Sequence, residues 1–323
     1  MLRERRQSLT KLTILVATWS DGLFAVTADG SKQEMANQPV RWLAPDGRGG
    51  ALAIVDRHSL SRRAPNGEWA IVATSELELS CCMAVRDTIY VGTDDARMLQ
   101  MKHGSSMLDP IDAFDNVAGR DAWFAGSAIV NGQRVGPPLG IRSVAANSNG
   151  SVLFVNVHVG GIPRSLDGGR TWQPTIEINS DVHEVRAHPA DPAIIAAASA
   201  VGLCISRDTG ETWTIEKHGL HAPHCSAVAF SGDDILVSAS TDPFAAQGRI
   251  YRRPIRPDGN ITVVEDGLPT WTNGKVDTGC IASNGSTIVA VDSAGTLYLS
   301  TEFGRAWLRS GGDLPTPSSV LIC

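Results

Sequence analysis

The feature that most constrains this chain is an eight-residue phrase that it contains twice. "SLDGGRTW" begins at Ser165 and "SRDTGETW" begins at Ser206, 41 residues later. A weaker copy, "STEFGRAW", begins at Ser300, and the longer gap before it fits two further steps of about 47 residues. A period in the forties is typical of a β-propeller, in which each repeat forms one blade of four antiparallel strands.

Short runs typical of strands surround each copy in a constant order. The segment "VHEVRAHPADPAIIAAASAVGLCISRDTGETWTIEK" contains four such runs separated by turn residues, and amphipathic helical periodicity is nearly absent from the chain. We therefore expect an all-β protein. The innermost strands are expected at "VRWLAP" near 41, "LSCCMAV" near 80, "IRSVAAN" at 141, "VHEVRAH" at 182, "HCSAVAF" at 224 and "VDTGCIA" at 276.

The two ends of the chain decide the number of blades. The first strand, in "LTILVATWSDG", has no inner strand before it, and the last, "SSVLIC", has no blade of its own. Pairing them predicts a seven-bladed β-propeller closed by its terminal strands, as a single domain over residues 1–323, with six blades as the alternative. Residues 116–140 are too long for a normal connection and are expected to be an insertion before blade 4.

The repeated phrase resembles the Asp-box, or BNR repeat, of sialidase-like propellers, sortilin-type receptors and photosystem II assembly factors. The full matches are Ser165, Asp167, Gly169, Thr171 and Trp172, and Ser206, Asp208, Gly210, Thr212 and Trp213. The Asp and Ser side chains suit hydrogen bonds to the backbone of the turn between the third and fourth strands, and the Trp suits packing between sheets. Asp167 and Asp208 are thus expected to be structural.

The resemblance to sialidases does not extend to their catalytic residues. That family uses an arginine triad, a nucleophilic Tyr with a Glu partner and an Arg-Ile-Pro motif early in the chain. This chain contains no Arg-Ile-Pro. Tyr90, Tyr251 and Tyr298 all lie among apolar neighbours inside expected strands. We do not expect a sialidase.

The expected site lies on the face opposite the repeated turns, at the mouth of the central tunnel, where connections vary over a rigid scaffold. The candidate catalytic residues there are His158, His183, Glu184 and His224, and the candidate substrate-binding residues are Arg142, Arg41, Trp42, Asp242 and Asp277. His158, His183 and His224 could also hold a divalent metal. Alternatively, histidines at strand ends simply cap turns.

Composition limits the partners. Charged residues make up 19% of the chain, its net charge is −6, and the only basic block is the "RERR" near the start, which argues against nucleic acid. No apolar run approaches the roughly 18 residues that span a bilayer, so no membrane partner is expected. The apolar run of residues 12–17 is short and is read as a strand. Six cysteines without a CxxC pair favour reduced thiols in a cytoplasmic protein.

These observations favour an enzyme of hydrolase or lyase type that acts on a small or sugar-like molecule. The alternative is a non-catalytic binding or assembly propeller that docks a protein partner or a carbohydrate. Clustered histidines favour the enzyme, because imidazoles transfer protons and bind metals near neutral pH.

Overall fold

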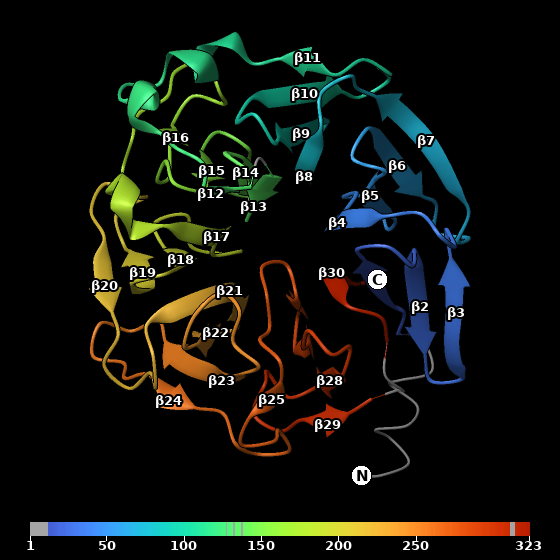
Figure 1. The fold of residues 1–323 in the computed structure, drawn as a ribbon, viewed down its shortest axis with the longest axis vertical. Coiled ribbons are helices and arrows are strands. Elements are labelled where there is room, and N and C mark those ends of the chain that lie inside the picture. The colour runs from blue at the N-terminus through green and yellow to red at the C-terminus, as the bar shows by residue number, and fades with distance from the viewer. Residues whose placement is uncertain (1–11, 127, 132, 137, 311–313) are drawn as a thin grey trace.

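The computed structural model describes residues 12–126, 128–131, 133–136, 138–310 and 314–323. Its sheets form seven blades arranged as a ring around a central opening (Figure 1), which confirms the seven-bladed, all-β prediction. Six blades was the wrong alternative. In the described part of the chain, the helices are three short 3-10 turns: η1 (Asp112–Asn116), η2 (Arg120–Ala122) and η3 (Ile178–Ser180).

Each blade runs from an inner to an outer strand. Blade 1 contains β30 (Pro317–Ile322), β1 (Ile14–Thr18), β2 (Leu23–Thr27) and β3 (Gly30–Glu34). Blade 2 contains β4 (Val40–Pro45), β5 (Ala51–Val55), β6 (Ser59–Arg63) and β7 (Trp69–Thr74). Blade 3 contains β8 (Leu79–Val85), β9 (Thr88–Thr93), β10 (Met98–Lys102) and β11 (Asp109–Pro110). Blade 4 contains β14 (Ile141–Ala146), β15 (Leu153–Val157) and β16 (Arg164–Ser165).

The other three blades follow the same order. Blade 5 contains β17 (Val182–Ala187), β18 (Ile195–Ser199), β19 (Gly202–Ser206) and β20 (Thr214–Glu216). Blade 6 contains β21 (His224–Ser231), β22 (Asp234–Ser240), β23 (Gln247–Pro254) and β24 (Thr262–Val263), and β25 (Thr272–Asn273) also pairs with β23. Blade 7 contains β26 (Ile281–Asn284), β27 (Thr287–Val291), β28 (Leu297–Ser300) and β29 (Leu308–Arg309).

The two ends of the chain close the ring as expected. Strand β30 pairs antiparallel with β1, with Val320 opposite Val16, and so supplies the inner strand of blade 1 (Figure 1). The Ser319 hydroxyl also accepts a hydrogen bond from the backbone N–H of Leu43, at 3.1 Å, which ties β30 to blade 2. Apolar side chains of β30 are buried between blades 1 and 7.

The segment before blade 4 departs from the repeat. Between β11 and β14 the chain forms η1, η2 and a small hairpin of β12 (Ala128–Val130) and β13 (Gln133–Val135). Residues 127, 132 and 137 of the expected insertion lie outside the described residues. The hairpin pairs with no blade in the described part of the chain.

The repeated phrases form hydrogen-bonded turns. In the first copy, the Asp167 carboxylate accepts bonds from the backbone N–H of Arg170 and of Thr171, and from the Thr171 hydroxyl at 2.7 Å. Asp208 makes the matching contacts with Thr212 in the second copy. These side chains therefore hold their own turns, in agreement with the structural role expected for them.

The remaining sequence expectations concern the thiols and the membrane. All six cysteines are free, and five of them are buried. The three tyrosines are buried as well. Among the described residues there is no helix with the length and hydropathy needed to cross a membrane.

Candidate functional site

The inner strands share a distortion at one end. In six of the seven, the pairing with the second strand shifts at the second or third residue, so that the inner strand has one residue more than its partner there. Such a β-bulge re-aims a side chain and is common next to active sites. The residues at these shifts are Ser318 in β30, Arg41 in β4, Ser80 in β8, Arg142 in β14, His183 in β17 and Ser226 in β21.

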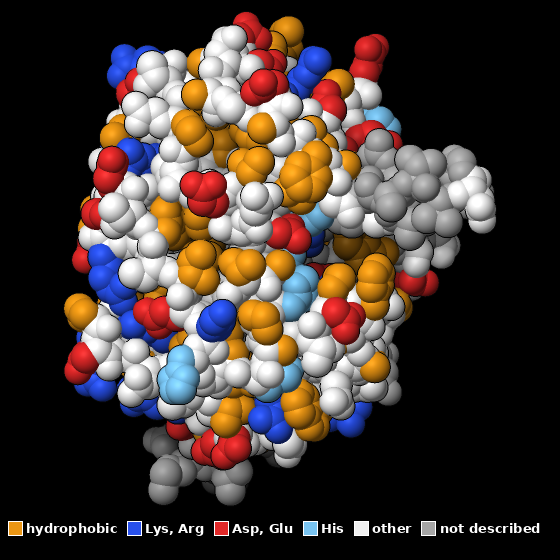
Figure 2. Space-filling view, turned by 60° about the vertical axis from the view of Figure 1, so that its left-hand side comes forward, with side chains coloured by type: hydrophobic (Ala, Val, Ile, Leu, Met, Phe, Trp, Pro, Cys, Tyr) orange, Lys and Arg blue, Asp and Glu red, His pale blue; other side chains and the backbone are white. Residues whose placement is uncertain are grey.

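All six of these residues line one cavity of about 750 Å³. Its other walls come from the turns after the second strands and from the connections between blades, including His158, Asp181 and His224. Figure 2 shows histidine side chains beside a hollow in the molecular surface. This volume lies within the usual range for small-molecule pockets. The site face chosen from the sequence therefore carries a real cavity.

Three histidines from three neighbouring blades meet in this cavity. The ring centroids of His158 and His183 are 6.1 Å apart, and those of His183 and His224 are 4.6 Å apart. His158 follows β15 of blade 4, His183 lies in β17 of blade 5, and His224 begins β21 of blade 6. The structure thus brings together the three imidazoles expected from the sequence.

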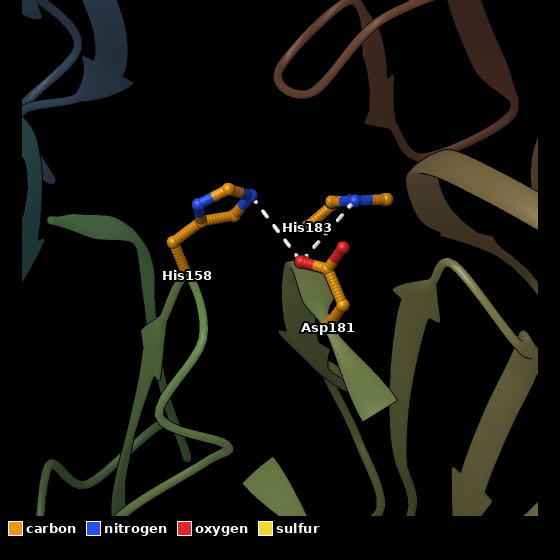
Figure 3. A group of neighbouring side chains, drawn as sticks. All are labelled: His158, Asp181 and His183. Carbon is orange, nitrogen blue, oxygen red and sulfur yellow. Dashed lines mark ion pairs between the residues drawn. The ribbon is translucent and has the colours of Figure 1, made fainter. Parts of the chain in front are cut away.

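The tightest group of donor atoms contains a carboxylate in addition to two imidazoles. Potential ligand atoms of His158, Asp181 and His183 all lie within 4.8 Å of one another. Asp181 Oδ1 is 3.2 Å from His158 Nε2 and 3.7 Å from His183 Nε2, and both rings point at it (Figure 3). Donor atoms bound to one ion at about 2.1 Å lie about 3.0 to 3.4 Å apart at octahedral and tetrahedral angles. The distances from Asp181 Oδ1 to the two ring nitrogens, 3.2 and 3.7 Å, lie in or near that range.

The hydrogen bonds leave this group ready to accept a cation. His183 Nδ1 lies 2.5 Å from the carbonyl oxygen of Cys225 and donates to it, so Nε2 is the ring nitrogen that faces Asp181. Asp181 Oδ1 is buried and accepts no hydrogen bond from any described residue. A buried oxygen without a donor is costly unless another partner satisfies it.

Electrostatics keep two of the imidazoles neutral. Burial and the Arg142 guanidinium lower the pKa of His158 to about 3. Burial and the His183 ring lower the pKa of His224 to about 4. Near pH 7 both rings are therefore uncharged, which is the form that binds metals and accepts protons.

The candidate substrate-binding residues differ in what they already contact. Both nitrogens at the end of Arg41 bond to the Asp94 carboxylate, at 2.6 and 2.7 Å. The Trp42 indole N–H donates to the carbonyl of Cys82 at 3.1 Å. Asp277 pairs with Lys275 at 2.9 Å. Arg41, Trp42, Asp277 and Arg142 all line the cavity.

Two candidates from the sequence lie elsewhere. The Asp242 carboxylate accepts the backbone N–H of Phe244 at 2.8 Å and caps a surface turn, and the residue is not in the cavity lining. Glu184 is fully buried beside Arg186, and it accepts backbone N–H groups from Val228 and Gly279. Glu184 follows the shifted residue His183, so the bulge turns its side chain away from the cavity.

Asp181 and Lys275 were missed in the sequence. Each lies two residues before a chosen residue, His183 or Asp277. Asp181 has a left-handed backbone conformation (φ 47°) just before β17, so the alternation of a strand does not apply to it, and no local pattern in the sequence marked it. His221, which lies shortly before β21, contacts Tyr251 and Trp271 and does not line the cavity.

No protein-family model matches the chain. No curated protein matches it either. Among solved structures, the GH74 enzyme of Niastella koreensis has a TM-score of 0.60 and 14% identity, over 92% of this chain and 46% of that one. YCF48 bound to D1 peptide has a TM-score of 0.58 and 12% identity, over 96% of this chain and 95% of that one. A chain of a mitotic checkpoint complex has a TM-score of 0.60 and 11% identity, over 86% of this chain and 80% of that one.

The chain has the β-propeller fold of these proteins. It spans less than half the length of the GH74 enzyme that it matches. The neighbours include enzymes and propellers that bind other proteins, and at these identities they share the fold alone.

Proposed function

We propose that the protein is an enzyme of hydrolase or lyase type, with the cavity at the tunnel mouth as its active site and a divalent metal held by His158, Asp181 and His183. The convergence of two imidazoles and one otherwise unbonded carboxylate oxygen on one point carries this proposal. Two histidines and a carboxylate form a common ligand set of catalytic zinc and iron sites, which leave positions open for substrate.

The proposal gives separate roles to the metal-binding group, to His224 and to Trp42. A bound divalent ion would polarise a substrate oxygen and make a bound water more acidic. His224 lies against His183 and is neutral, so its ring could accept a hydrogen bond from a bound water or from the substrate. Trp42 would form part of the apolar wall. The substrate is a small or sugar-like molecule, in keeping with a cavity of about 750 Å³.

The second candidate is a propeller that docks a protein partner or a carbohydrate. Two aromatic side chains that line the cavity are largely exposed: Trp19 at 52% and Phe244 at 84%. Exposed aromatic side chains often anchor partners. This reading requires neither a metal nor the alignment of the imidazoles.

Metal analysis tests the proposed function. The purified protein is stripped with a chelator, incubated with Zn²⁺ or Mn²⁺, desalted and analysed by elemental mass spectrometry. We expect about one equivalent of one of these ions. We expect Asp181→Ala and His183→Ala to lose it, because each removes a donor atom.

The matched control is His188→Ala. This histidine caps the turn after β17 by accepting the backbone N–H of Asp191, and it does not line the cavity. It should retain the metal. Protein that holds neither ion, or whose metal content is the same in wild type and in both ligand variants, would contradict the proposal and favour the docking propeller.

A further inference from the structure

We propose that the ligand of this cavity carries an oxyanion, a carboxylate or a phosphate group, and that Arg142 binds it. The inference rests on the proposed function in one respect only, namely that the same cavity holds the substrate. The proposed ligand is therefore an anion, in contrast to a neutral sugar.

The Arg142 guanidinium has more N–H donors than its hydrogen bonds to the described residues use. Its Nη2 donates to the Thr278 hydroxyl at 3.0 Å, and it forms no ion pair with any described residue. A guanidinium has five N–H donors in a planar fork that matches the two oxygens of a carboxylate or phosphate. Because Arg142 lines the cavity, its remaining donors are available to a ligand.

The other cations in the cavity are already paired. Arg41 binds both oxygens of Asp94, and Arg57 donates to the same carboxylate at 2.8 Å. Lys275 is paired with Asp277. Among the described residues that line the cavity, Arg142 is therefore the guanidinium without a carboxylate within ion-pair distance, and the Asp277 and Asp181 carboxylates act on its charge from farther away.

The surroundings hold Arg142 in place. Thr278, which accepts its hydrogen bond, donates in turn to the backbone carbonyl of Ser226 at 3.2 Å. Arg142 is also the residue at the β14 bulge, so the backbone aims its side chain at the cavity. A guanidinium fixed before binding loses less conformational entropy when the ligand arrives.

Arg142 is also close to the metal-binding group. Its charge is among the causes that lower the pKa of His158. An anion bound to Arg142 would thus lie beside the proposed metal, and an ion on Asp181 would offset the negative charge of that carboxylate. Phosphate affinity should therefore increase when the metal is bound.

Calorimetric titration tests the inference. Inorganic phosphate and succinate are titrated into wild type, Arg142→Gln, Arg142→Lys and Arg170→Gln, each with and without the metal. Arg170 lies in the first repeated turn and is the control. We expect at least one of the two anions to bind with one-to-one stoichiometry, at least tenfold more weakly in Arg142→Gln, with unchanged affinity in Arg170→Gln.

The variants and the two anions have separate roles. Arg142→Lys keeps the charge but not the fork, so it should bind more weakly than wild type and more tightly than Arg142→Gln. The tighter of the two anions identifies the group on the ligand. Circular dichroism and the melting temperature check that each variant is folded.

The outcomes distinguish this inference from the proposed function. Wild-type affinity in Arg142→Gln, no binding of either anion to wild type, or displacement of the anion by neutral glucose would overturn the anion site, even if the metal binds as expected. Anion binding that depends on Arg142 in a protein that holds no metal would support the anion site and contradict the metal enzyme.

Discussion

Single residues show how similar side chains serve opposite faces of the ring. Asp167 and Asp181 are both carboxylates at turns. The Asp167 oxygens are occupied by hydrogen bonds from Ser165, Arg170 and Thr171. Asp181 Oδ1 has no such donor and faces two imidazoles. The number of local donors, more than the residue type, separates a carboxylate that stabilises a turn from one that can bind a ligand.

This difference predicts a pH dependence for Asp167. Hydrogen bonds from Thr171 lower the pKa of Asp167 from 3.8 to about 2. Because the folded pKa lies below the unfolded one, the carboxylate adds stability above about pH 4 and loses it as the pH falls toward 2. Asp167→Asn should therefore be less stable than wild type at pH 6, and the difference in free energy of unfolding should shrink at pH 3.

Urea unfolding at a series of pH values measures this difference. Thr171→Val removes one donor to the carboxylate and should reduce the pH dependence without abolishing it. A difference between wild type and Asp167→Asn that stays constant from pH 6 to pH 3 would contradict the assignment. Metal content should be the same in both proteins, because the turn does not line the cavity.

At the scale of strands, the bulges explain what the sequence could and could not predict. Alternating patterns and turn residues indicated the inner strands of blades 2 to 6 correctly, but the inner strand of blade 7 was expected from Val276 and is β26, which begins at Ile281. The positions of His158, His183 and His224 near one mouth followed from strand order. A bulge inserts one residue into this alternation, and no local pattern announces it. Glu184 was expected in the cavity because it stands next to His183 at the start of blade 5, but its carboxylate is bound by the backbone N–H groups of Val228 and Gly279. Asp181, which precedes the bulged strand, was missed.

The same bulges predict a role for Glu184. The Glu184 carboxylate accepts two backbone N–H groups, from Val228 at 3.0 Å directly after the shift in β21 and from Gly279 at 3.3 Å just before β26. Glu184→Ala would leave these donors and Arg186 without their partner. We expect a loss of about 2 to 4 kcal/mol in the free energy of unfolding.

Chemical denaturation together with metal analysis separates this role from catalysis. Glu184→Gln keeps one acceptor oxygen and should cost less stability than Glu184→Ala, while the metal content of the folded protein stays at the wild-type level. A Glu184→Gln protein with wild-type stability and no anion or metal binding would instead make Glu184 part of the site.

At the scale of the whole molecule, the ring depends on one pairing between segments that are far apart in the chain. Strand β30 lies between β1 and the inner strand of blade 2 and buries Val320, Leu321 and Ile322. Without it, β1 becomes the inner edge of a three-stranded blade, and the apolar clusters on both sides are opened to water. The site would suffer as well, because Pro317 and Ser318 line the cavity.

Deleting residues 317–323 should therefore abolish cooperative unfolding, with loss of a single sharp transition in calorimetry. Deleting only Cys323, which is exposed and follows the strand, is the matched control and should leave the melting curve nearly unchanged. A synthetic peptide of residues 314–323 should restore the transition of the truncated chain, because its strand can pair again with β1. A truncated chain that melts like wild type would show that blade 1 does not need β30 and that the ring is held by other contacts.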